Sequence, residues 1–311
     1  MTQRASQLAV LVLILAVALT APACSGGDAT READEEIAET PPEAVERFQA
    51  LYDEGQTHFE ARADRQEVLK AVDRWSEALA VEDDGTISDD HRAQAYQSLA
   101  RAHYFLARYH GTDGGPVSAE PELAQLAMLG FEAATEAVKI EAPGFHESVE
   151  RGAPFEGELA DAPAQAAESL LLYAKNLHLA ARAQGTSATV SADPVVDAIM
   201  ELVAAEAPQL HFGAAHRYFG ARSVDRAFNR SAQRSAQSFE KALNQAPDYL
   251  ATRFDRAIYL ATFQGDREAY EAELQAIIDS PADAAPGATA ENEIVQGWAR
   301  QWLAKSDDLF D

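Results

Sequence analysis

Apolar residues beyond Pro42 recur at intervals of three and four positions, alanine is abundant among them, and no run of β-branched residues alternates with polar ones. This spacing is typical of the buried face of an α-helix, whereas a strand would alternate at every second position. We therefore predict an all-α fold. The expected helices cover residues 43–61, 66–81, 89–110, 121–141, 164–184, 194–207, 212–228, 230–245, 249–264, 267–279 and 290–305.

Two of these helices carry start signals. Ser88 can cap the helix after it, because a serine oxygen accepts a hydrogen bond from a free amide of the first turn. Asp193 followed by Pro194 predicts a start at Pro194, since proline lacks only an amide hydrogen that the first turn leaves unbonded.

A repeat is visible in the second half of the chain. Phe239, Ala242 and Pro247 match the bulky, small and proline positions of the second helix of a tetratricopeptide repeat, and Pro281 follows Pro247 after the 34 residues of that repeat. The small-residue positions between the two prolines hold Ala257, Ala269 and Ala276. The register is irregular elsewhere. We predict an α-solenoid of divergent tetratricopeptide-like helical hairpins with extra helices; the alternative is a nonrepetitive helical bundle.

The start of the chain has the pattern of a secretory signal peptide, predicted to span residues 1–23. An apolar run extends from Leu8 to Leu19, and small residues lead to Cys24, the single cysteine. The run is shorter than the roughly 20 residues that a membrane-spanning helix needs. The placement of Cys24 resembles the bacterial lipoprotein signal and predicts an acylated Cys24 as the new N-terminus; Ser25 after it indicates an outer-membrane lipoprotein. The alternative is ordinary cleavage that leaves a free thiol.

Residues 24–42 are polar and acidic, which predicts a flexible tether between the acylated N-terminus and a helical repeat domain at 43–311. The net charge is −26. So negative a chain repels phosphate backbones and anionic lipid, which argues against nucleic-acid binding and leaves the lipid anchor as the predicted contact with the membrane.

Catalytic and metal-binding patterns are missing from the sequence. The eight histidines form no HExxH motif, and there is no CxxC, no Asp-x-Asp calcium loop and no Gly-x-Ser-x-Gly elbow. His103 and His110 lie two helical turns apart, but a structural pair beside Tyr104 and Tyr109 is the better interpretation. We expect a protein that is not an enzyme and that holds no metal or cofactor.

Three stretches of the second half resemble the T-component family of tripartite ATP-independent periplasmic (TRAP) transporters, often called TatT. They are the aromatic and alanine-rich residues 167–181, the segment 211–221, and the closing region made of 238–250, 254–257, 291–293 and 304–310. The similarity runs over roughly residues 66–311. It departs from the family at Tyr173 and His178, where a tryptophan-containing pair and a glycine are common. The resemblance implies a periplasm-facing lipoprotein that self-associates as a trimer and engages the solute-binding protein of a TRAP importer.

Aromatic and polar side chains gather on helices that should be neighbours in the stack. An aromatic floor with arginine, asparagine and histidine would suit a small carboxylate, an amphipathic ligand or a partner protein. The alternative is that the aromatics are packing anchors and that the arginines form surface ion pairs. The candidate binding residues are Tyr173, Asn176, His216, Arg217, Tyr218, Phe219, Tyr249 and Arg253. The predicted function is that of a binding component of a TRAP-type uptake system; a scaffold lipoprotein in envelope assembly is the alternative.

Overall fold

The regular elements of the described residues are all helices, which confirms the predicted all-α class. The computed structural model describes residues 44–82, 85–117, 119–226 and 228–310. The predicted signal peptide, Cys24 and the tether therefore lie outside the described residues. The helices are α1 (Ala44–Glu60), α2 (Arg65–Leu79), α3 (Asp89–Phe105), η2 (Leu106–His110), α4 (Pro121–Glu141), α5 (Pro143–Glu150), α6 (Glu156–Ala160), η3 (Ala164–Ala166), α7 (Ala167–Gln184), α8 (Thr186–Glu206), α9 (Leu210–Arg222), α10 (Ala232–Gln245), α11 (Leu250–Asp255), η4 (Arg256–Ala261), α12 (Thr262–Gln264), α13 (Arg267–Asp279), η5 (Ala282–Ala284), α14 (Thr289–Leu303) and α15 (Ser306–Phe310).

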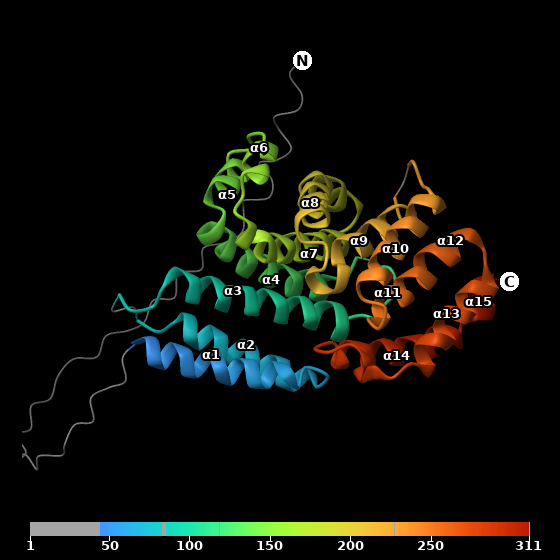
Figure 1. Cartoon of the computed structure of the whole chain (residues 1–311), viewed down its shortest axis with the longest axis horizontal. Coiled ribbons are helices and arrows are strands. Elements are labelled where there is room, and N and C mark those ends of the chain that lie inside the picture. The colour runs from blue at the N-terminus through green and yellow to red at the C-terminus, as the bar shows by residue number, and fades with distance from the viewer. Residues whose placement is uncertain (1–43, 83–84, 118, 227, 311) are drawn as a thin grey trace, which may run out of the picture. The chain divides into compact units, whose positions relative to one another are not determined.

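In the first half, each long helix packs on the next one along the chain, from α1 through α4, and α4 then packs on α7 (Figure 1). Small residues permit the close approach of α4 to α7. A Cβ added at Gly130 of α4 would lie 2.1 Å from Oδ1 of Asn176 of α7. The short helices α5 and α6, which the apolar pattern did not predict, lie in the segment that connects α4 to α7.

The second half packs α9 on α10, and α13 on both η4 and α14. Phe239, Ala242 and Ala257, which carry the predicted repeat signal, are fully buried. Ala276, in contrast, is exposed, and Leu274 and Ile277 face the core from α13. The predicted phase of the repeat is therefore wrong at Ala276.

The predicted start of a helix at Pro194 is also wrong. α8 begins at Thr186, so Pro194 lies in its interior, and Asp193 pairs with Arg222 of α9 at 2.6 Å instead of capping a helix. Pro194 is exposed, so its ring causes no clash with the core. The predicted helix 212–228 ends early, at Arg222.

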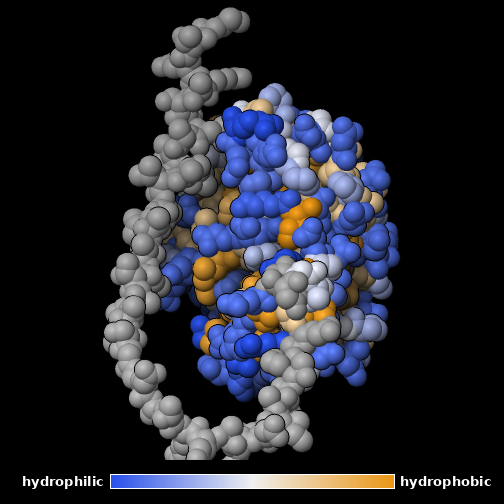
Figure 2. Space-filling model, turned by 90° about the vertical axis from the view of Figure 1, so that its left-hand side faces the viewer, coloured by the Kyte–Doolittle hydropathy of each residue, from blue (hydrophilic) through white to orange (hydrophobic). Residues whose placement is uncertain are grey.

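The face that Figure 2 shows is mainly hydrophilic. In the face that Figure 2 shows, hydrophobic residues form small separate areas between hydrophilic ones. Among the described residues, no helix has the length and apolar character needed to cross a membrane.

Candidate functional site

Three irregular backbone segments border two neighbouring cavities. η2 is a π-helical turn that ends the helix begun by α3, and η4 is a π-helical turn between α11 and α12. At the start of α9, His211, Phe212 and Gly213 have left-handed conformations with φ of 46°, 60° and 76°. π-turns are frequent at functional sites, and a left-handed histidine or phenylalanine costs free energy that the surrounding structure must offset. η2 contributes to both cavities, η4 to the first and the left-handed turn to the second.

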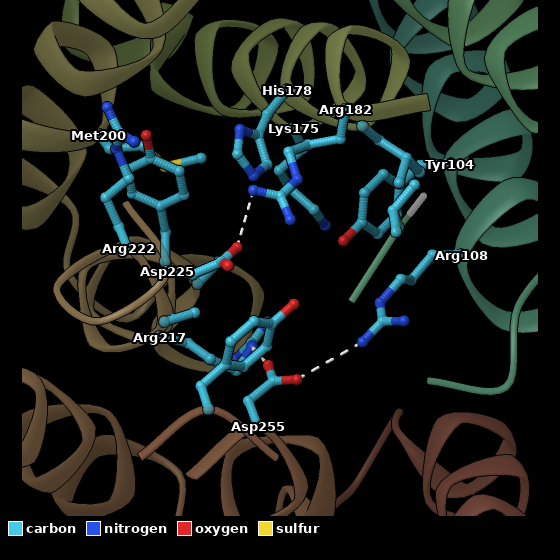
Figure 3. Close-up of a pocket in the computed structure, with 16 residues that line it drawn as sticks. Tyr104, Arg108, Lys175, His178, Arg182, Met200, Arg217, Arg222, Asp225 and Asp255 are labelled. Carbon is cyan, nitrogen blue, oxygen red and sulfur yellow. Dashed lines mark hydrogen bonds and ion pairs between the residues drawn. The ribbon is translucent and has the colours of Figure 1, made fainter. Parts of the chain in front are cut away.

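The first, here called the inner cavity, has a volume of about 130 Å³ and lies between α3, α7, α8, α9 and η4 (Figure 3). Its apolar wall includes Leu179 and Met200. Its polar lining residues are Tyr104, Arg108, Lys175, His178, Arg182, Arg217, Tyr218, Arg222, Asp225, Asp255 and Tyr259.

The lining holds four arginines and Lys175 together with the carboxylates of Asp225 and Asp255, and Asp193 and Asp197 pair with Arg222 from outside the lining. Asp255 is shared by two arginines: its carboxylate lies 3.5 Å from Arg108 and 3.6 Å from Arg217. Arg182 pairs with Asp225 at 2.7 Å. A buried carboxylate shared by two guanidinium groups leaves donors that can bind a further anion.

The far wall of the inner cavity is held by Tyr218 and Arg222 of α9. The Tyr218 hydroxyl donates to Asp197 of α8 at 2.6 Å, and its ring meets the His178 ring edge to face with centroids 5.2 Å apart. Burial lowers the pKa of His178 to about 3, so this histidine is neutral at physiological pH.

The second cavity, here called the aromatic cavity, has a volume of about 500 Å³ and lies between α1, α3, α7, α9 and α14. Six aromatic side chains line it: Phe59, Tyr104, Phe105, Tyr109, Phe212 and Tyr249. The Phe212 and Tyr249 rings stack at 4.5 Å, and the Tyr249 and Tyr109 hydroxyls are 2.6 Å apart. The left-handed turn therefore serves to place the Phe212 ring on this wall.

Arg217 joins the two cavities. Its guanidinium donates to the carbonyl oxygen of Phe212 at 3.0 Å and lies 4.8 Å from the centroid of the Tyr249 ring. The same group reaches Asp255 in the inner cavity. Arg217 thus stabilises the left-handed turn while it contributes positive charge to the site.

Lys175 and Tyr104 belong to the linings of both cavities. Lys175 Nζ lies 4.0 Å from the centroid of the Tyr104 ring and 3.0 Å from Nδ1 of His211. Burial, reinforced by the charges of Arg217 and Arg101, lowers the pKa of Lys175 to about 7.

His211 links Lys175 to a carboxylate. Its Nε2 lies 3.4 Å from Glu168, which also pairs with Arg101. A carboxylate only accepts hydrogen bonds, so Nε2 carries the hydrogen and Nδ1 accepts from Lys175. The hydrogen bond from His211, together with Arg101, lowers the pKa of Glu168 to about 2.

Of the residues that the sequence singled out, the structure brings Arg217 and Tyr218 to the inner cavity and Tyr249 to the aromatic cavity. Tyr173 instead packs in the core against Phe131 and Phe145.

The other four candidates lie outside both linings. Asn176 is fully buried, and its amide donates to the backbone carbonyls of Ala100 and Leu172. Phe219 packs on Tyr218, His216 is half-buried, and Arg253 pairs with Glu273 at 3.4 Å.

Sequence reasoning missed Lys175, Arg108 and Asp255. Lys175 directly precedes the predicted Asn176, and Tyr104 and Arg108 are one turn apart on a predicted helix. That spacing places Tyr104 and Arg108 on one face, but it says nothing about which face meets α7 and η4.

The arrangement is suited to binding. In the part of the chain that the structure describes, no three histidine, cysteine or carboxylate side chains come together as a metal site would require. Fold and cavities together define an all-α protein with an arginine-rich interior cavity next to an aromatic one.

The sequence model of the TRAP transporter T-component family matches residues 119–310. The chain therefore belongs to the TRAP transporter T-component family, as its resemblance indicated. The family associates the chain with a TRAP transport system, and it is a family of transporter components rather than of enzymes. No curated protein matches the chain significantly.

Proposed function

We propose that this chain is the periplasm-facing binding component of a TRAP-type uptake system, anchored through an acylated Cys24. In this proposal it holds a small organic anion in the inner cavity and engages the solute-binding protein of the system. The observation that carries the ligand part is the gathering of four arginines and Lys175 on the lining of the inner cavity, in a chain whose net charge is −26. The arginines are paired with carboxylates, but a guanidinium group has five N–H donors and keeps some of them for a further anion.

The aromatic cavity supports a ligand with an apolar part. Its rings lie directly beyond Lys175 and Tyr104, so an anionic group held by Lys175 or Arg217 would leave the rest of the molecule free to contact aromatic faces. The proposed ligand class is therefore a carboxylate with a short apolar body.

Isothermal titration calorimetry with a panel of carboxylates and their neutral amides tests this assignment. The carboxylates should bind and the amides should not. Arg217→Gln should weaken binding about 10- to 100-fold, the scale of a charge-assisted hydrogen bond. Arg253→Gln is the matched control, because Arg253 lines neither cavity and should leave binding unchanged. Equal binding of acids and amides would contradict the anion site.

The partner assignment has its own experiment. A mild-detergent pull-down of the full-length protein from its native membrane should capture a solute-binding protein in stoichiometric amount. Tyr173 and Asn176 are buried, so the partner must dock on other residues. Recovery of the protein with other envelope components and without a solute-binding protein would favour the scaffold function instead.

A further inference from the structure

Lys175 differs from the other cations of the inner cavity in its partners. Arg108 and Arg217 share Asp255, Arg182 pairs with Asp225, and Arg222 pairs with Asp193 and Asp197. Among the described residues, no carboxylate lies within ion-pair distance of Lys175. Within the described part of the chain, Nζ has a hydrogen bond to a histidine nitrogen and lies over the face of a tyrosine ring.

The charges that face Lys175 come from four elements. α3 contributes Arg101 and α9 contributes Arg217, and both oppose a positive charge on Nζ. Glu168 of α7 and Glu291 of α14 favour that charge.

The two carboxylates that favour a charged Lys175 are already paired with other groups. Glu168 is already bound by Arg101 and His211, and Glu291 is bound by Arg62 at 2.7 Å. The remaining neighbours are neutral: burial lowers the pKa of His211 to about 3 and raises that of Tyr104.

The hydrogen bond to His211 is possible in both charge states of the amine, because a neutral amine can still donate one hydrogen bond to Nδ1. The Tyr104 ring face favours the charged form, but this contact is weaker than a carboxylate pair would be. An anion between the two cavities would supply the carboxylate that Lys175 lacks. The attraction would favour the charged form and raise the pKa of Lys175 again.

We propose that Lys175 is a proton-linked anion receptor: at pH 8 it is mainly neutral while the cavities are empty, and it becomes protonated when the anionic group of a ligand enters between them. The neutral amine takes one proton from solvent and becomes an ammonium group that pairs with the ligand carboxylate; no covalent bond of the ligand changes. The site therefore captures an anion and a proton together. This inference rests on the proposed function, because it requires an anionic ligand.

The test uses the full-length protein and 3-phenylpropanoate as the probe, titrated at pH 8 in HEPES and in Tris, whose ionisation enthalpies differ. The difference in apparent binding enthalpy should correspond to nearly one proton taken up at pH 8. At pH 6, in two buffers that titrate there and differ in ionisation enthalpy, it should correspond to almost none. Because only the protonated form pairs with the anion, and the pKa of Lys175 is about 7, the Kd should be about tenfold larger at pH 8 than at pH 6.

Two variants assign the proton. Lys175→Arg keeps the positive charge at every pH and should bind the probe without proton uptake at pH 8, whereas Lys139→Met, at an exposed position, should behave as the parent does. Proton uptake that persists in Lys175→Arg would come from another group and would overturn the inference.

If Lys175→Arg does not fold, the Kd of the parent protein is the test. A Kd that is the same at pH 6 and pH 8 excludes proton linkage through Lys175. Failure of 3-phenylpropanoate and of every other carboxylate in the panel to bind would overturn the proposed function itself.

Discussion

Gly130 determines how closely α4 approaches α7. The Cβ of an alanine there would lie 2.1 Å from Oδ1 and 2.7 Å from Cγ of Asn176, whose amide is held by two backbone carbonyls. Gly130→Ala should therefore lower the free energy of unfolding by about 1–3 kcal/mol through overpacking. Denaturant unfolding measures the change.

Gly297 is the matched control for Gly130. It lies inside α14, and nothing lies within 4 Å of an added Cβ. Gly297→Ala should stabilise the protein by up to about 1 kcal/mol, because alanine loses less backbone entropy in a helix. If Gly130→Ala and Gly297→Ala lost equal stability, the loss would come from the replacement of a helical glycine itself and not from the α4–α7 contact.

Lys175 makes the stability of the folded protein depend on pH. The unfolded chain holds the lysine proton up to about pH 10.4, whereas the folded protein releases it near pH 7. Between these values the unfolded state binds more protons, so the contribution of Lys175 to stability rises with pH. Below pH 7 the full cost of holding the charged lysine in the folded protein is present.

Lys175→Met removes this cost. The Tm of the variant should exceed that of the parent by at least about 2 °C at pH 6, the shift expected from roughly 1 kcal/mol in a protein of this size. The advantage should shrink as the pH approaches 10. Lys139→Met, at a surface position, should show no such trend. A constant difference at all pH values would mean that Lys175 titrates normally.

At the scale of elements, the close contact of α9 with α10 depends on a small residue. Ala242 of α10 is fully buried, and its Cα lies 3.2 Å from the position of a Cβ added at Gly213 of α9. Ala242→Phe should therefore overpack the pair and cost about 1–3 kcal/mol of unfolding free energy.

Ala236 provides the comparison on the same helix. It is exposed, so Ala236→Phe should change the melting temperature little. An unchanged transition in Ala242→Phe would mean that α9 and α10 separate freely. Ala242 lies beside Gly213, the last residue of the left-handed turn, and Arg217 donates to that turn at Phe212. A shift of α10 should therefore also alter ligand binding at Arg217.

At the scale of the whole molecule, the proposed lipid anchor at Cys24 would determine where the binding site operates. Cys24 follows the small residues after the apolar run, so mass spectrometry of the mature protein should find an acylated Cys24 at its N-terminus. Cys24→Ser should move the protein from the membrane fraction to the soluble fraction without changing its circular dichroism spectrum. A free thiol at Cys24 in a fully soluble parent protein would contradict the anchor.

The all-α class and most helix positions were predictable from the sequence, because the buried face of an amphipathic helix appears in the sequence as apolar residues three and four positions apart. The bounds of α4 and α13 agree with the prediction, and the buried Phe239, Ala242 and Ala257 carried a repeat signal. The start of α8 was not predictable in this way. Asp193 and Pro194 form a good local start signal, but packing of α8 on α7 and α9 and the Asp193–Arg222 pair favour a longer helix.

The site was only partly predictable, because it too depends on packing between helices that are distant in the sequence. Arg217, Tyr218 and Tyr249 stood out by residue type and line the cavities. The sequence by itself determined which aromatic and cationic residues the second half offers, but the cavities also take residues from the first half. Only the tertiary structure decided that Tyr173 and Asn176 are core residues and that Tyr104, Arg108, Lys175 and Asp255 line the cavities. These four residues come from α3, η2, α7 and α11. A sequence pattern reports which face of each helix is buried, but the free energy of packing between distant helices decides which buried faces enclose a cavity and which fill the core.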